Sequence, residues 1–429
     1  MQDKTPSSVF TNRDFNLLFG GSSISSLGDQ FTLVALPWLV LKLTGNPAAL
    51  GAVLAMIALP RAAFMLIGGA VVDRMSPRRV LLASRACNAL FIAILAVLVL
   101  AHAIQIWMVY VLALGIGLST AFAYPAGSAI LPQLVESRQL RSANALVMGM
   151  RQLSMFVGPV LAGLVISVGN HGRHGQALAD AYGMGLAFGI DAVSFLFSLA
   201  SLFMIRIRSD LHPPQAVDSV LRGVAKGISS VWADRPLRAL ILYVAVVSVF
   251  VGGPIQVGLP VLADTRLDLG AASLGILMAA NGGGVLVGSF ASGIGTRFMR
   301  GRLGLMVLCI DILSGLGLAA LAWVHATFTG AVLMACVGLL SGTAQIAVLT
   351  WIQQRIPQEM MGRTMSVLIF TFMGLGPISA AIAGVLLKVM PLMALFAGAG
   401  LVLTLIALAC LFSPQLRSIG ATPRTAASA

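Results

Sequence analysis

Charge is what this sequence has least of. Asp, Glu, Lys and Arg together make up 10% of its 429 residues, against about 25% in soluble globular domains. Hydrophobic residues account for 58%, and a water-soluble fold of this size could not cover its surface with so few charges. Runs of about 20 mostly apolar residues, enough to cross a bilayer as a helix, recur along the whole chain. The sequence therefore predicts an all-α membrane protein.

Several chemical motifs are also missing. The four cysteines have no metal-site spacing and read as small packing residues inside apolar runs. No Gly-x-x-x-x-Gly-Lys-Ser/Thr loop occurs, so ATP hydrolysis by that route is excluded. His171 and His174 are three residues apart, but a solvated external loop is favoured over a metal site. No intramembrane His/Glu or Ser/His set looks catalytic, so we expect no enzyme activity, no metal and no cofactor.

The positive charge has a membrane explanation. A net charge of +13 would indicate nucleic acid for a soluble protein, but cytoplasmic loops of membrane proteins are enriched in Lys and Arg. We therefore expect a lipid bilayer and no nucleic acid as partner. The polar segment 1–14 lacks the apolar core of a signal peptide, and the first apolar stretch begins at Phe15.

Twelve transmembrane helices are predicted, in two six-helix pseudo-symmetric halves. A polar stretch separates the sixth span from the seventh, which predicts an N-terminal half over 1–206, a cytoplasmic linker over 207–235 and a C-terminal half over 236–429. The spans are 15–43, 48–72, 80–102, 104–126, 140–168, 183–206, 236–263, 271–296, 303–324, 327–351, 363–388 and 390–412.

Orientation follows from the distribution of basic residues. The even-numbered loops and the two tails hold 20 Lys and Arg residues, whereas the opposite loops hold four: Lys42, Arg173, Arg266 and Lys388. Basic residues stay on the cytoplasmic side. We therefore expect a multi-pass protein of the bacterial inner membrane with both termini in the cytoplasm.

The two halves carry a weak internal repeat. Segment 133–146 leads into the fifth span and reaches Gly158 and Pro159, as segment 354–367 leads into the eleventh and reaches Gly376 and Pro377. The basic turn 73–79 has a counterpart in 296–302. Two similar halves are typical of transporters that bind substrate between repeats.

Segment 69–79 carries a family resemblance. Its glycine, acid and basic residues (Gly69, Asp73, Arg74, Arg78 and Arg79) are similar to the loop between helices 2 and 3 of the major facilitator superfamily, although Ser76 stands where glycine is usual. The resemblance covers essentially the full chain. It implies that this loop is a gate whose contacts are made in one conformation and broken in the other.

Further segments narrow the resemblance to the branch of bacterial siderophore and macrolide exporters. They are 12–15, 26–30, 43–45, 59–61, 144–146 and 188–195. Gly158, Pro159 and Gly163 partly resemble the antiporter motif of helix 5. The family fold implies that helices 1, 2, 4, 5, 7, 8, 10 and 11 surround a central cavity, with the others outside.

Charged residues inside spans are the candidates for coupling or substrate binding, because such charges are costly and mark function or internal ion pairs. Asp29, Arg61, Arg151 and Asp191 are the principal candidates, and Asp311 is a fifth. Asp29 and Arg61 have the strongest claim, because a buried carboxylate can carry a proton; the alternative is a static pair between helices 1 and 2. Arg151 holds either an anionic group or helix 5. Asp191 and Asp311 lie on outer helices, which favours structural roles.

The predicted function is secondary active transport: proton-driven export, by alternating access, of a drug-like or siderophore-like small molecule. Two alternatives stay open. One is an importer or facilitator of the same fold, and the other is a membrane receptor or assembly protein that does not transport. The glycines after Asn281 indicate either close helix packing, which is favoured, or a hinge.

Overall fold

The computed structural model describes residues 8–136, 138–168, 180–205, 229, 232–298, 302–356, 374–417 and 419, and for 65–74 and 294–298 it describes the backbone alone. These residues form helices and turns without a strand. Eleven helical segments are long and apolar enough to cross a membrane, and Gly374–Leu386 is a shorter apolar helix. The eleven are α1 (Arg13–Thr44), α2 (Pro47–Arg74), α3 (Pro77–Leu100), α4 (Ile106–Leu134), α5 (Leu140–Val168), α6 (Ala181–Met204), α8 with α9 (Arg235–Arg266), α10 (Ala271–Phe298), α11 (Leu303–Ala320), α12 (Thr327–Arg355) and α14 (Leu392–Cys410).

The predicted all-α membrane fold is confirmed, and each predicted span coincides with one of these helices. Two differ in detail. The fourth helix continues to Leu134, eight residues beyond the predicted end at 126, because a membrane helix tolerates Pro125 and Pro132 in its interior. The seventh span consists of α8 (Arg235–Gly253) and α9 (Leu259–Arg266), joined by a π-helical turn over Pro254–Gly258. Residues 363–373 of the eleventh span lie outside the described part of the chain.

The ends of α1 show how local sequence sets helix limits. Asn12 precedes the helix, and its side-chain oxygen accepts hydrogen bonds from the backbone N–H groups of Asp14 (2.9 Å) and Phe15 (3.1 Å). Such a cap satisfies donors that have no partner within the helix. The helix stops at Gly45, whose φ of 59° is left-handed and costs glycine little.

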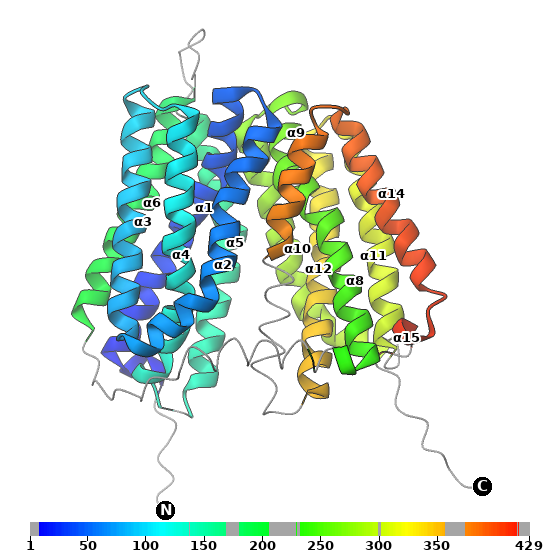
Figure 1. Ribbon diagram of the computed structural model, residues 1–429, viewed down its shortest axis with the longest axis horizontal. Helices are drawn as coiled ribbons and strands as arrows, with labels where there is room; N and C mark the ends of the chain where they lie inside the picture. The colour runs from blue at the N-terminus through cyan, green and yellow to red at the C-terminus, as the bar shows by residue number, and fades with distance from the viewer. Residues whose placement is uncertain are drawn as a thin grey trace, which may run out of the picture. The chain divides into compact units, whose positions relative to one another are not determined.

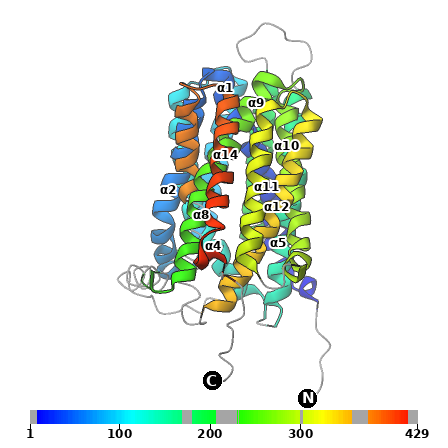
Figure 2. The ribbon, with the colours of Figure 1, turned by 90° about the vertical axis from the view of Figure 1, so that its right-hand side faces the viewer.

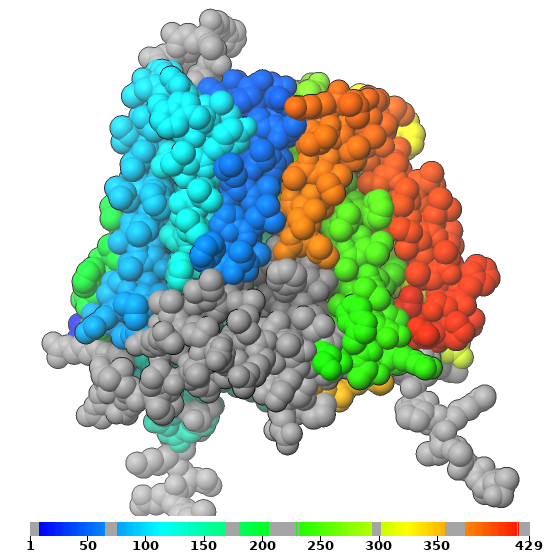
Figure 3. Space-filling view, in the orientation of Figure 1, coloured from blue at the N-terminus to red at the C-terminus, as the bar shows by residue number. Residues whose placement is uncertain are grey.

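The chain divides into two compact units. Unit 1 comprises Met1–Val220 with Leu269–Gly275, and unit 2 comprises Leu221–Asp268 with Ile276–Ala429. In unit 1, α1 packs on α5 and α6, α2 on α4, and α3 on α4 and α6 (Figure 1). Figure 3 shows α2, α3 and α4, coloured blue to cyan, side by side on one face of this unit.

Unit 2 repeats these pairings six spans later. Helix α14 packs on α8 and on α11, as α6 does on α1 and α3, and α11 packs on α12 as α3 does on α4 (Figure 2). Backbone contacts join α10 to α12 at Gly284, Gly338 and Gly342, as Gly117 of α4 joins α2 at the carbonyl of Ile57. The two units are thus versions of one six-helix fold, as expected for internal repeats.

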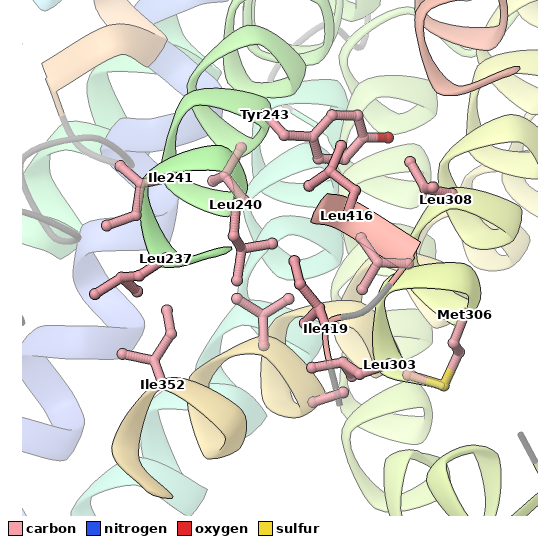
Figure 4. Packing of buried hydrophobic residues seen from close by; sticks show 14 of the residues in the cluster. Leu237, Leu240, Ile241, Tyr243, Leu303, Met306, Leu308, Ile352, Leu416 and Ile419 are labelled. Atoms are coloured by element: carbon pink, nitrogen blue, oxygen red, sulfur yellow. The ribbon is translucent and has the colours of Figure 1, made fainter. Parts of the chain in front are cut away.

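Each unit contains its own cluster of buried apolar side chains, and the two clusters lie at corresponding places. In unit 1 the cluster includes Phe15 of α1, Leu81 of α3, Ile130 of α4 and Leu202 of α6. In unit 2 it includes Leu237 of α8, Leu303 of α11, Ile352 of α12 and Leu416 of α15 (Pro414–Arg417), as Figure 4 shows. In each unit the cluster joins the start of the first and third helices to the end of the fourth helix. It also includes the end of α6 in unit 1 and the short helix α15, which follows α14, in unit 2.

A polar contact accompanies each cluster. In unit 1, Asn12 Nδ2 donates to the carbonyl of Leu134, 2.5 Å away at the end of α4. In unit 2, Asp234 caps α8 and accepts two hydrogen bonds from Arg355 at the end of α12, at 2.6 and 3.1 Å. Burial opposes ionisation of Asp234, but the hydrogen bonds from Arg355 and from the Leu237 backbone, with the charge of Arg355, lower the pKa of this carboxyl.

Candidate functional site

The packing of α1 on α6 brings polar groups into the interior of unit 1. Asp191 of α6 is completely buried, and it accepts a hydrogen bond of 2.5 Å from the Thr32 hydroxyl of α1. Ser194 Oγ lies 3.2 Å from the other carboxylate oxygen. Gly28 makes the close approach possible, because a Cβ there would collide with Ser194 and Asp191. Asp191 is therefore bound to the interface of α1 and α6, which fits the expected structural role.

Arg85 of α3 connects the same two helices. Its guanidinium donates to Ser198 Oγ of α6 and, over 3.2 Å, to Ser22 Oγ of α1. Ser22 precedes Asp29 by seven residues, and Ser198 follows Asp191 by seven, so each pair shares a helix face two turns apart. Arg85 thus places a positive charge where α1, α3 and α6 meet. Its two serine partners lie on the helix faces that carry Asp29 and Asp191.

Asp29 is the centre of the charged group. It is an exposed residue of α1, the seventeenth of 32, and the positive charges of Arg85 and Arg151 act on its carboxylate. The Asp29 charge also acts on Asp191. A carboxylate this far along a membrane helix needs counter-charges, water or a proton. The structure supplies counter-charges from α3 and α5.

Arg61 lies inside α2, where the sequence placed it. Among the described side chains, no ion pair joins Asp29 to Arg61. The charged group that acts on Arg61 is Arg151, which carries the same sign. The charges that act on Asp29 therefore come from α3 and α5, through Arg85 and Arg151. Arg61 and Arg151 place two positive charges near one another, with Asp29 beside Arg151.

The 69–79 segment is described in part. For Gly69, Asp73 and Arg74 the structure describes the backbone alone. Arg78 donates from Nε to the carbonyl of Leu202 (3.2 Å) and from Nη2 to that of Phe203 (2.7 Å), at the end of α6. A cation at a helix C-terminus satisfies terminal carbonyls and the helix dipole. Arg79 is exposed. Within unit 1, Arg78 therefore attaches this segment to α6.

Small residues of helix 5 mark close contacts. Gly158 and Pro159 are buried, and a Cβ at Gly158 would collide with the Gln30 side chain of α1. Gly163, also buried, lies against the backbone of Ala271, which belongs to unit 1. These residues let α5 approach its neighbours. In unit 2 the same holds for α10, where Gly284 meets the backbone of α12, and this supports the packing interpretation of the glycine run.

A third intramembrane acid lies in unit 2. Asp311 of α11 accepts a hydrogen bond of 2.7 Å from the Tyr243 hydroxyl of α8.

The histidine pair considered as a metal site, His171 and His174, lies outside the described residues. In the part of the chain that the structure describes, no three His, Cys, Asp or Glu residues gather as a metal site would require.

Sequence reasoning missed Arg85, although a signal was present. The loops hold 24 of the 27 Lys and Arg residues, and the three others are Arg61, Arg85 and Arg151. An arginine inside an apolar span is as unusual as an aspartate there. Arg85 lies eight residues from the start of α3, well inside the helix.

In the described part of the chain, eleven span-length apolar helices and a shorter one form two similar units with charged side chains inside the spans, an arrangement that fits a polytopic membrane transporter. Comparison with known proteins identifies the family. The family model of the Major Facilitator Superfamily matches residues 18–381, and the chain belongs to this family. Its relatives are transporters and not enzymes, which confirms the prediction that this chain is not an enzyme.

Two relatives are exporters. The chain is 28% identical over 413 residues to the multidrug efflux pump Tap of Mycolicibacterium fortuitum, which covers 94% of this chain and 96% of that protein. It is 26% identical over 300 residues to the enterobactin exporter EntS of Shigella boydii serotype 18. That match covers 70% of this chain and 67% of the exporter. The predicted resemblance to exporters is thereby confirmed.

Solved structures share the fold. A bacterial homologue of the iron transporter ferroportin, in an inward-facing state, matches with a TM-score of 0.67 and 20% identity, covering 94% of this chain and 99% of that one. The nucleoside transporter NupG matches with a TM-score of 0.71 and 11% identity, covering 92% and 99%. At these identities the likeness concerns the fold alone.

Proposed function

We propose that this protein exports a drug-like or siderophore-like compound by alternating access, driven by the proton gradient. The observation that carries the proposal is the similarity to the efflux pump Tap along 94% of the chain, together with an intramembrane carboxylate, Asp29, among basic residues. The relatives support the substrate class, since one is a multidrug efflux pump and another exports enterobactin. The chemistry of the charged residues supports the proton as the coupling ion.

Asp29 is the residue that we assign to proton coupling. When ionised, it compensates Arg85 and Arg151. When Asp29 takes up a proton, the guanidinium groups of Arg85 and Arg151 lose its attractive negative charge. The repulsion between Arg151 and Arg61 is then no longer offset by that charge. A proton shifts a conformational equilibrium only by its different affinity for the two states. Asp29 provides that difference if its distance from the two arginines changes between states.

The same residues offer a link to substrate. Ionised Asp29 can hold a cationic group of the exported molecule, and protonation of Asp29 releases that group, so the proton and the substrate bind in alternation, as exchange in opposite directions requires. Binding of substrate and of the proton are then linked, and the linkage is reciprocal. Arg61 and Arg151, from α2 and α5, are candidates for contacts with anionic parts of the same molecule.

The test of coupling is transport into proteoliposomes by the Asp29→Asn variant. Asparagine keeps the shape and cannot take up the proton. With one proton per substrate, a gradient of one pH unit supplies about 1.4 kcal/mol, or roughly tenfold accumulation. We expect the variant to equilibrate substrate without accumulating it. Asp14→Asn, which alters a carboxylate in the first turn of the same helix, serves as the matched control. Full accumulation by Asp29→Asn would move the coupling site elsewhere.

Substrate class is tested in cells. Intracellular concentrations of antibiotics and secreted metabolites are compared between cells with and without the protein, and the exported compound should rise in its absence. A compound that falls instead would favour the importer or facilitator. No gradient-dependent movement of any solute in vesicles would favour the receptor or assembly protein.

Location and orientation belong to the same proposal. We place the protein in the bacterial inner membrane with both termini in the cytoplasm, because 20 of the 24 basic loop residues lie on that side of the twelve-span layout. Reporter fusions after Ser76 and within 207–235 should report cytoplasm, and a fusion at Arg173 should report the outside. A cytoplasmic signal at Arg173 would contradict this orientation.

A further inference from the structure

Asp311 occupies the middle of a membrane span. It is the ninth of the 18 residues of α11, about 12 Å from either end at 1.5 Å per residue. Arg85 is likewise the ninth residue of α3, the corresponding helix of unit 1. Each unit therefore has a charged residue at the ninth position of its third helix. The charge is positive in unit 1 and negative in unit 2.

Asp311 is half-buried, and its side-chain hydrogen-bond partner is Tyr243. Tyr243 of α8 donates a hydrogen bond of 2.7 Å to Asp311 Oδ2, and Tyr243 is itself 5% exposed. Tyr243 belongs to a cluster of buried apolar side chains that also includes Val244, Val307 and Ile310. Figure 4 shows the Tyr243 ring extending from α8 toward Leu308 of α11.

Counter-charge is what distinguishes Asp311 from Arg85. In the described residues, Tyr243 from α8 is the titratable group that faces Asp311, and Cys410 from α14 acts on Tyr243 in turn. The charged residue that the structure describes on α12 is Arg355, and it is bound to Asp234. Arg85, by contrast, has two hydroxyl partners and an acid. Asp311 has one donor and, among these residues, no cation.

An ionised carboxylate in such a place is unstable. Its desolvation costs several kcal/mol, which one neutral hydrogen bond of about 1 kcal/mol does not offset. The neutral acid keeps the bond from Tyr243 at its carbonyl oxygen and removes the charge. Tyr243 also remains a ready donor if the proton leaves.

We propose that Asp311 and Tyr243 form a proton-binding site inside unit 2, separate from Asp29. Asp311 binds and releases the proton, and Tyr243 is a positioning residue that supports the ionised form by its hydrogen bond. The site does not rest on the export function, because proton binding is a property of the folded protein with or without substrate. In a proton-driven transporter it would add a second exchangeable proton.

Carbodiimide labelling of the purified protein tests the proposal. A protonated carboxyl adds to dicyclohexylcarbodiimide and gives a stable N-acylurea, whereas a carboxylate does not react in this way. Peptide mass spectrometry then reports modification at each acid separately as the pH is varied. We expect Asp311 to be labelled at low pH and to lose the label as the pH rises.

Two variants and a control make the test specific. Asp311→Asn should abolish this label and lower proton uptake, followed by acid–base titration, by about one proton per molecule over the same pH range. Tyr243→Phe removes the donor to the ionised form, so labelling of Asp311 should persist to higher pH. Ser314→Ala changes a buried hydroxyl one turn further along α11 and should leave the profile unchanged.

Two outcomes would overturn the proposal. The first is an Asp311 that stays unlabelled at every pH while another intramembrane acid reacts, with proton uptake unchanged in Asp311→Asn. The second is labelling of Asp311 that does not vary with pH in either the parent protein or Tyr243→Phe. The Asp29→Asn transport result is independent of both, so failure of the export proposal and failure of this one are distinguishable.

Discussion

Replacing Arg85 by methionine tests whether this residue sets the charge balance of Asp29 or merely joins helices. The substitution keeps an unbranched apolar side chain of similar reach. It removes the hydrogen bonds to Ser22 and Ser198 and one of two positive charges acting on Asp29. These two losses have different readouts.

The hydrogen-bond loss is modest. Interhelical hydrogen bonds in membrane proteins average about 0.6 kcal/mol and reach about 1.7, so two of them contribute roughly 1 to 3 kcal/mol to stability. The charge loss is comparable, since unit charges at an effective dielectric constant of about 20 interact by about 4 kcal/mol at 4 Å and about 2 at twice that separation. A loss of 2 kcal/mol corresponds to more than one pH unit.

The assay is the pH dependence of substrate transport in proteoliposomes. With less compensation, Asp29 holds its proton to higher pH, so the midpoint of Arg85→Met should move upward by about one unit or more. Arg85→Lys keeps the charge and should keep the midpoint. Ser198→Ala removes a hydrogen bond and no charge, so it should lower thermal stability alone. An unchanged midpoint in Arg85→Met, or an equal shift in Ser198→Ala, would refute the electrostatic role.

Three further predictions concern other contacts. Gly117→Ala should lower thermal stability by about 1–3 kcal/mol, because its Cβ meets the Ile57 carbonyl; Gly127→Ala in the same helix, with open space around it, should not. Asp234→Asn should cost about 1 kcal/mol or less, since the pair with Arg355 is partly exposed, and an equal loss at every pH would contradict the ion pair. Because the folded-state pKa of Asp234 is lowered, its stabilisation is present above pH ~4 and is lost as the pH falls further. Asp73→Asn should slow transport with normal membrane insertion; undiminished transport would make segment 69–79 an anchor alone.

Local sequence was sufficient for the spans, because membrane insertion depends on the length of an apolar run. The run after Phe15 therefore predicted α1, and Asn12 and Gly45 mark its ends by backbone chemistry that needs no distant partner. The fourth helix was predicted too short because Pro125 and Pro132 are helix breakers in water and are tolerated in a membrane helix.

The acids themselves were also visible in the sequence, since an Asp inside an apolar run stands out wherever it lies. Asp29, Asp191 and Asp311 were found in this way. Their partners were not. Thr32 and Tyr243 are unremarkable residues of apolar helices, and they matter only because they face Asp191 and Asp311 across a helix interface.

What the sequence alone determined is the class of protein: an all-α transporter with charges inside its membrane spans. What only the tertiary structure decided is which charges meet. Consecutive helices suggested that Asp29 pairs with Arg61, yet α1 packs mainly on α5 and α6, and Arg85 of α3 reaches into the same junction. Contacts across helices depend on the rotation and neighbours of each helix, and these are set by small residues such as Gly28 and Gly158. The separation of two residues along the sequence does not indicate whether their side chains meet across helices.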